Sequence, residues 1–96
     1  ARYIEVTNAQ HFDSFLSFPG YPDRYVPLHV YLIRALNTMH AHLTQGAALP
    51  PSQVVRTVPR GIGAPAITAA NVPAWSDAPA EGDRIRFEHR TLHVPD

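Results

Sequence analysis

A histidine occupies the position at which α/β proteins present reactive side chains. Tyr3–Thr7 is rich in β-branched and aromatic residues, which predicts a short strand. Asn8, Ala9 and Gln10 break that pattern, and His11 follows in the loop beyond the strand's carboxyl end. Ligands and reactive groups gather at this edge of open α/β sheets, and an imidazole exchanges protons near neutral pH. His11 is therefore the candidate general base, with an ordinary loop histidine as the alternative.

The other members of a serine–carboxylate–histidine triad are not recognisable in this chain. Serine nucleophiles of the α/β-hydrolase kind lie in Gly-x-Ser-x-Gly, and no serine here has glycines at that spacing. Asp13 stands two residues after His11, where a helix N-cap for a short turn through Ser14–Leu16 is favoured over a partner carboxylate. Because the histidine comes last in the hydrolase order, a C-terminal piece would contain it without the serine and the acid.

Three aromatic side chains follow the histidine loop and are candidates for substrate binding. Phe18, Tyr21 and Tyr25 surround the segment Pro19–Asp23, in which proline and glycine are expected to stop regular structure. These rings either wall a pocket or cover the edge of a core, which is the commoner role of aromatic residues.

Six histidines raise the question of a metal site. His89 and His93 would share a face only on a continuous backbone, and a turn predicted near His89–Arg90 breaks that register. His40 and His42 point to nearly opposite sides of a predicted helix. There is no cysteine and no third ligand at a recognisable spacing, so we predict no metal and no cofactor.

The main helix is predicted from Pro27 to Gln45, with Gly46 directly after its end. His29, near its start, is expected to be neutral and structural. One apolar face follows three-four spacing, and further apolar residues widen it. The face comprises Leu28, Leu32, Ala35, Leu36, Met39 and Leu43, widened by Val30, Tyr31 and Ile33. Such a helix needs a large apolar partner, and the remaining residues offer little to cover it.

Residues 47–96 form a Pro/Ala-rich extension. Gln53–Val58 is a candidate strand. Gly63–Pro79 is interpreted as an ordered coil anchored on a neighbouring surface, with a flexible linker as the alternative. The expected anchors are Ile67, Val72 and Trp75. Residues 84–94 alternate apolar and polar side chains, which predicts a terminal hairpin. Its inward-facing residues would be Ile85, Phe87, Leu92 and Val94.

Composition limits the class of protein. A chain of 96 residues is one small domain or part of a larger one. The net charge is zero and no basic stripe is present, which argues against nucleic acid as a partner. No apolar run approaches the ~20 residues that span a bilayer, so no membrane partner is expected. The first residues lack methionine and the features of a signal peptide, as expected of a chain entered partway through.

Several segments resemble the C-terminal part of the 3-hydroxybutyrate oligomer hydrolases. They are residues 3–13 (YIEVTNAQHFD), 26–31 (VPLHVY), 41–61 (AHLTQGAALPPSQVVRTVPRG), 67–73 (ITAANVP) and 94–96 (VPD). The longest of these runs is specific, and the resemblance is weakest across residues 74–90.

The resemblance implies an α/β fold, namely the C-terminal portion of an α/β-hydrolase-like fold that is not a complete domain alone. Residues 1–46 would supply the last strand, the histidine loop and the long helix, and residues 47–96 the extension. The activity implied is that of a serine esterase, which cleaves dimers and short oligomers of (R)-3-hydroxybutyrate to the monomer during polyhydroxybutyrate breakdown.

Within that family the implied role of His11 is the triad histidine, and Phe18, Tyr21 and Tyr25 would flank the acyl pocket. The expected partner is the remainder of the same hydrolase, which would carry the serine and the Asp or Glu, so this chain alone should be inactive. The resemblance also implies a secreted or periplasmic enzyme, although no export signal is visible here. The alternative is a non-catalytic module that packs on a larger partner, which the main helix and the proline-rich coil would suit equally well.

Overall fold

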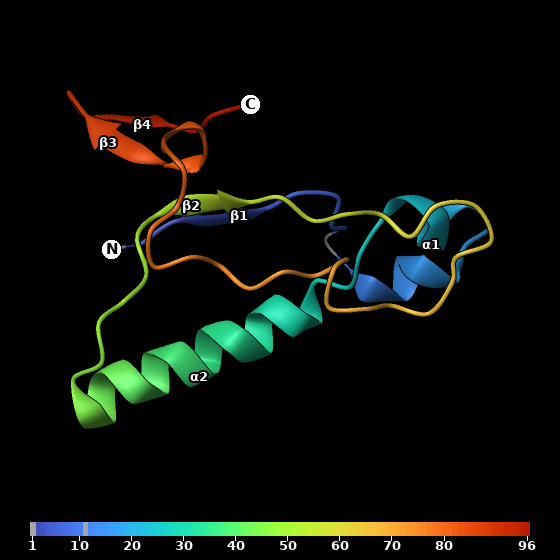
Figure 1. Cartoon of the computed structure of the whole chain (residues 1–96), viewed down its shortest axis with the longest axis horizontal. Coiled ribbons are helices and arrows are strands. Elements are labelled where there is room, and N and C mark those ends of the chain that lie inside the picture. The colour runs from blue at the N-terminus through green and yellow to red at the C-terminus, as the bar shows by residue number, and fades with distance from the viewer. Residues whose placement is uncertain (1, 11) are drawn as a thin grey trace.

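The computed structural model describes residues 2–10 and 12–96, so the candidate base His11 lies outside the described residues. Its elements are two parallel strands, a long helix, a terminal hairpin and three short helical turns (Figure 1). In chain order they are β1 (Ile4–Val6), η1 (Asp13–Ser17), α1 (Tyr21–Arg24), α2 (His29–Gln45), β2 (Gln53–Val55), η2 (Glu81–Asp83), β3 (Arg86–Glu88) and β4 (Thr91–His93).

Strands β1 and β2 form a parallel pair in which Ile4 lies opposite Gln53 and Val6 opposite Val55. A parallel pair needs a crossover connection, and α2 supplies it, which makes β1–α2–β2 a βαβ unit. The strand predicted near the N-terminus is thus present, and the candidate strand Gln53–Val58 is confirmed over its first half. One expectation is corrected: β1 is not the last strand of its sheet, because β2 follows it in parallel.

The core lies between this strand pair, the start of α2 and the proline-rich coil. Val26, Tyr31, Val55 and Val72 are its buried members. The interpretation of residues 63–79 as an ordered coil is confirmed, because Val72 is buried and Ile67 and Trp75 pack against the same cluster. The coil is also hydrogen-bonded to the helix: the Tyr31 hydroxyl donates to the Pro73 carbonyl at 2.7 Å. The alternative of a flexible linker is therefore wrong.

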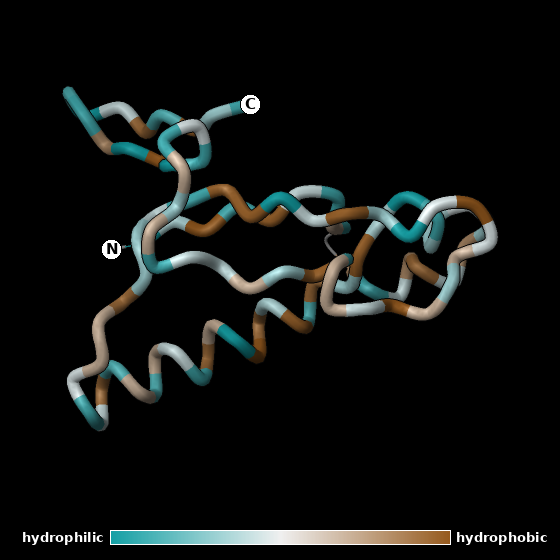
Figure 2. Tube along the Cα trace, viewed as in Figure 1, coloured by the Kyte–Doolittle hydropathy of each residue, from teal (hydrophilic) through white to brown (hydrophobic). Residues whose placement is uncertain are grey.

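Helix α2 begins at His29 and ends at Gln45, and Gly46 takes the left-handed conformation (φ 69°) expected of a residue that closes a helix. Its buried residue is Tyr31, whereas the predicted apolar face is largely exposed to solvent. Leu36 and Leu43 are 62% and 74% exposed. Figure 1 shows why: only the first turns of α2 lie beside the core, and the rest of the helix runs away from the strands. The tube in Figure 2 carries apolar residues along this outer part of α2 as well.

The terminal hairpin is present, with Phe87 opposite Leu92. Its two-residue turn is His89–Arg90, as predicted, and both residues have positive φ (51° and 62°). The prediction of inward-facing side chains holds for Ile85, which is buried, and is wrong for the rest of the set. Phe87 is 66% exposed, and Leu92 and Val94 are exposed too. The reason is visible in Figure 1, where the hairpin projects from the body of the molecule and offers its faces to solvent.

Regular structure persists where Pro19–Asp23 was expected to stop it. Gly20 adopts a left-handed conformation (φ 81°) and leads into the single turn of α1. Pro22 sits in the first turn of that helix, where its missing N–H is not needed.

Among the helices of the described residues, none has the length and apolar character that a membrane crossing requires.

Candidate functional site

The described residues on either side of His11 in the sequence contact residues at and just before the start of α2. On the strand side, the buried residue Val26 donates its N–H to the Asn8 carbonyl at 2.7 Å, and Ala9 forms a parallel bridge with Val26. On the other side, Asp13 contacts Leu28 and His29. His11 itself lies outside the described residues. Its neighbours in the sequence contact the short segment of residues 26–29.

The Asp13 carboxylate caps the N-terminus of α2. Its Oδ1 accepts the Leu28 N–H at 2.7 Å, and its Oδ2 accepts the His29 N–H at 2.9 Å. The sequence predicts that Asp13 caps the short turn through Ser14–Leu16, and that prediction is wrong. Instead it is the first residue of η1, and its side chain satisfies the unpaired N–H groups of the later helix. The cap therefore acts between segments far apart in the sequence, and it joins the histidine loop to α2.

The ionisation of Asp13 reflects these contacts. Burial alone would raise the pKa of the Asp13 carboxyl, but it is opposed by hydrogen bonds from the N–H groups of His29 and Leu28 and from the His29 ring. Together these bonds hold the pKa of Asp13 below its ordinary value of 3.8. The carboxylate is thus ionised at neutral pH and acts there as an acceptor only.

The imidazole of His29 is oriented by the same carboxylate. Its Nδ1 lies 2.6 Å from Asp13 Oδ2 and must donate, because an ionised carboxylate has no proton to give. The second ring nitrogen, Nε2, has no hydrogen-bond partner among the described residues, and the side chain is 61% exposed. Sequence reasoning assigned His29 a structural role. The sequence does not indicate that the ring is also exposed to solvent, with Nε2 available for a further hydrogen bond.

His29 borders an open hollow of about 470 Å³. Its lining residues are Phe12, Asp13, Leu28, His29 and Leu32. The lining is mainly apolar, with the His29–Asp13 pair as its polar part. A hollow with an apolar wall and few polar groups is the usual form of a small-molecule site.

The three aromatic candidates lie together beside this region. Phe18 and Tyr21 meet edge to face with ring centres 5.7 Å apart, and Tyr21 and Tyr25 are separated by 5.4 Å. Phe15 stacks on Phe18 at 5.6 Å and meets Phe12 edge to face at 5.8 Å. An aromatic row therefore runs from the hollow to Tyr25. A role of these rings in substrate binding stays a prediction.

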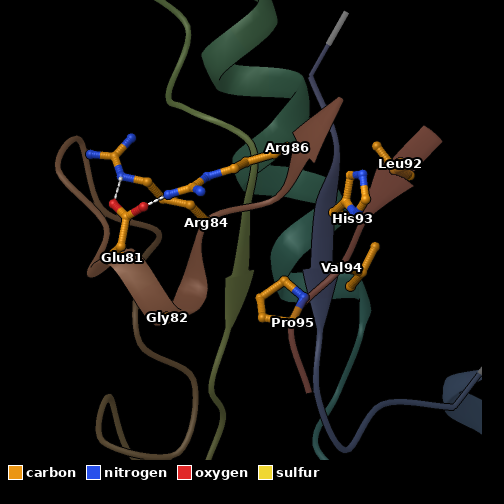
Figure 3. A pocket seen from close by; sticks show the side chains of 8 residues that line it. All are labelled: Glu81, Gly82, Arg84, Arg86, Leu92, His93, Val94 and Pro95. Carbon is orange, nitrogen blue, oxygen red and sulfur yellow. Dashed lines mark ion pairs between the residues drawn. The ribbon is translucent and has the colours of Figure 1, made fainter. Parts of the chain in front are cut away.

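A larger hollow of about 530 Å³ lies at the terminal hairpin, and it is a weaker candidate for a functional site (Figure 3). Its one carboxylate, that of Glu81, is engaged by both Arg84 and Arg86. His93 lines the same hollow. Across the described part of the chain no three metal-ligating side chains come together.

Comparison with known proteins identifies close relatives. The model of a family described as 3HB-oligomer hydrolase matches residues 1–96. Three similar proteins carry the name D-(-)-3-hydroxybutyrate oligomer hydrolase. That of Polaromonas naphthalenivorans is 60% identical, that of Paracidovorax citrulli 56% and that of Cupriavidus necator 54%. Each alignment covers 98% of this chain and 14% of the relative, so the chain spans about one-seventh of their length. No solved structure matches.

Proposed function

The chain belongs to the 3HB-oligomer hydrolase family, and we propose that it is part of a serine esterase that hydrolyses dimers and short oligomers of (R)-3-hydroxybutyrate to the monomer. The observation that carries this proposal is the family match over the whole chain, with more than half of its residues identical to proteins of that name. The proposed setting is the breakdown of polyhydroxybutyrate by an exported enzyme.

We propose further that the chain is the C-terminal portion of an α/β-hydrolase-like fold. The β1–α2–β2 unit has the parallel strands and helical crossover of such a fold. Parallel sheets normally have both faces covered, and two strands of three residues are too few for a stable sheet. The exposed apolar residues of α2, Leu36, Met39 and Leu43, likewise favour burial against the rest of the hydrolase.

His11 is the proposed triad histidine. It takes the proton of a serine hydroxyl supplied by the rest of the protein, and the serine oxygen attacks the ester carbonyl. The alcohol leaves with that proton, and an acyl-enzyme remains. Water then gives a proton to His11 and attacks the acyl carbon, which releases 3-hydroxybutyrate and restores the serine. The oxyanion is stabilised by donors outside this chain.

Asp13 is a poor candidate for the triad acid, although it stands two residues from His11. Both of its oxygens already accept hydrogen bonds from Leu28 and His29. Moving the carboxylate to orient another histidine would break the cap of α2. We therefore assign the acid, like the serine, to the part of the hydrolase beyond this chain.

The substitution His11→Ala in the complete protein tests this proposal. Turnover of 3-hydroxybutyrate dimers should fall by about 10³-fold or more, because a triad loses its general base. His40→Ala, in an exposed histidine of α2, is the matched control and should leave turnover nearly unchanged. A loss of less than tenfold in His11→Ala would identify His11 as an ordinary loop residue.

A further inference from the structure

The ring of His29 is held at the hollow beside Asp13 in a defined orientation. Its own N–H and its Nδ1 both bond to Asp13 Oδ2, at 2.9 and 2.6 Å. Two contacts from one residue to one oxygen fix the ring relative to the start of α2. Because Nδ1 donates to the carboxylate, the neutral ring has its lone pair on Nε2, which is then a hydrogen-bond acceptor.

The lining of the hollow that His29 borders suits a small hydroxylated aliphatic group. Phe12, Leu28 and Leu32 provide apolar wall, and no lysine or arginine lines the hollow. The carboxylate of Asp13 is ionised, so it disfavours a second carboxylate close by. A 3-hydroxybutyrate oligomer has a carboxylate at one end and a neutral hydroxyl at the other. The hollow favours the hydroxyl end.

The hollow is also near the proposed reaction centre along the chain. Phe12 and Asp13 directly follow His11, and two extended residues reach at most about 7 Å. Phe12 and Asp13 are thus within the reach of one or two residues from the proposed base along the chain.

On the strength of the proposed esterase function, we propose that this hollow binds the hydroxyl-terminal 3-hydroxybutyryl unit of the substrate. The methyl group lies against Phe12, Leu28 and Leu32, and the 3-hydroxyl donates a hydrogen bond to His29 Nε2. His29 thus determines specificity for a hydroxylated acyl group, and Asp13 positions the ring.

Two esters with the same leaving group test the assignment in the complete enzyme: p-nitrophenyl (R)-3-hydroxybutyrate and p-nitrophenyl butyrate. They differ only in the 3-hydroxyl, so the ratio of their kcat/KM values measures recognition of that group. His29→Asn keeps an amide donor near the place of Nδ1 and removes Nε2. The ratio should fall about three- to tenfold, the usual value of one hydrogen bond, and chiefly through KM.

His29→Gln is the matched variant. Its amide reaches the place of Nε2 but leaves the place of Nδ1 empty, so the side-chain hydrogen bond to Asp13 is lost. It should retain more of the ratio than His29→Asn. A ratio unchanged in His29→Asn, or lowered equally in both variants, overturns the assignment. Failure of the esterase proposal looks different: the wild-type enzyme would hydrolyse neither ester, or His11→Ala would remain active.

A filled hollow provides a second measurement that does not depend on His29. Leu32 lines the hollow and is not a member of the buried core cluster, so Leu32→Phe adds volume at the hollow itself. The KM of the hydroxylated ester should rise several-fold as the bulkier ring occupies the site of the acyl unit. An unchanged KM would show that the substrate does not use this hollow.

Discussion

Gln53 and Ser76 are joined by two hydrogen bonds that run side by side between β2 and the proline-rich coil. The Gln53 Nε2 donates to the Ser76 carbonyl and the Gln53 Oε1 accepts the Ser76 N–H, both at 2.8 Å. The same amide nitrogen also donates to the Pro51 carbonyl at 2.9 Å. Gln53 is only 2% exposed, so this buried amide is fully paired and fixes the coil against the strand.

Gln53→Glu in the complete protein should lower the free energy of unfolding by about 1–3 kcal/mol or more. The new carboxylate cannot donate to the Ser76 and Pro51 carbonyls, and a charge would be buried beside them. Urea unfolding measures the loss. Gln45→Glu, at the exposed end of α2, is the control, and an equal effect of both substitutions would contradict the role of Gln53.

The cap of α2 by Asp13 should make stability depend on pH in the acid range. Its folded pKa lies below that of the unfolded chain, so the contribution is fully present above about pH 4. It is lost as the pH falls through the lowered folded value. The difference in unfolding free energy between wild type and Asp13→Asn should therefore shrink on acidification. A difference that stays constant down to about pH 2 would show that the charge of Asp13 does not stabilise the cap.

Leu36→Ala reports whether the exposed side of α2 is covered in the complete protein. Leu36 is 62% exposed here, yet burial against the rest of the hydrolase would make its loss cost about 2–5 kcal/mol. Chemical unfolding of the complete protein gives this value. Ile62→Ala, at a residue 98% exposed, should change little. A cost below about 0.5 kcal/mol for Leu36→Ala would mean that this side faces solvent.

The chain of residues 1–96 alone should be inactive on p-nitrophenyl butyrate and on 3-hydroxybutyrate dimers, because it contains no recognisable nucleophile. Its helicity by circular dichroism should be weak, since helices of this length depend on packing. Appreciable hydrolysis by residues 1–96 would refute the view that the chain is only a fragment of the esterase. A cooperative thermal transition with strong helicity would favour the non-catalytic module instead.

Local patterns in the sequence were sufficient for the elements that depend on local rules. The helix ends where Gly46 allows a left-handed residue, and the hairpin turns at His89–Arg90, where the apolar alternation is interrupted. The strand at the N-terminus and the start of β2 follow from β-branched residues. In each case the deciding residues are neighbours in the chain.

The errors concern interactions between distant segments. No spacing rule shows that Asp13 caps a helix starting at His29, because that contact depends on how the loop returns to α2. The alternation in the hairpin indicates two faces, but not whether anything packs on Phe87. The hollow beside His29 was missed for the same reason. Its walls come from two segments that only the fold brings together.

The pairing of Ile4 with Gln53, and of Gln53 with Ser76, has a consequence for biosynthesis. The first strand emerges from the ribosome well before either partner exists. At ordinary rates of translation, about 5–20 residues per second, the delay between Ile4 and Ser76 is roughly 4 to 14 seconds. Contacts of such long range also form slowly. During that interval β1 lacks its partner β2 and is an unpaired edge that chaperones can bind and that can mispair. The arrangement is complete only when the proline-rich coil has been synthesised and Ser76 can pair with Gln53.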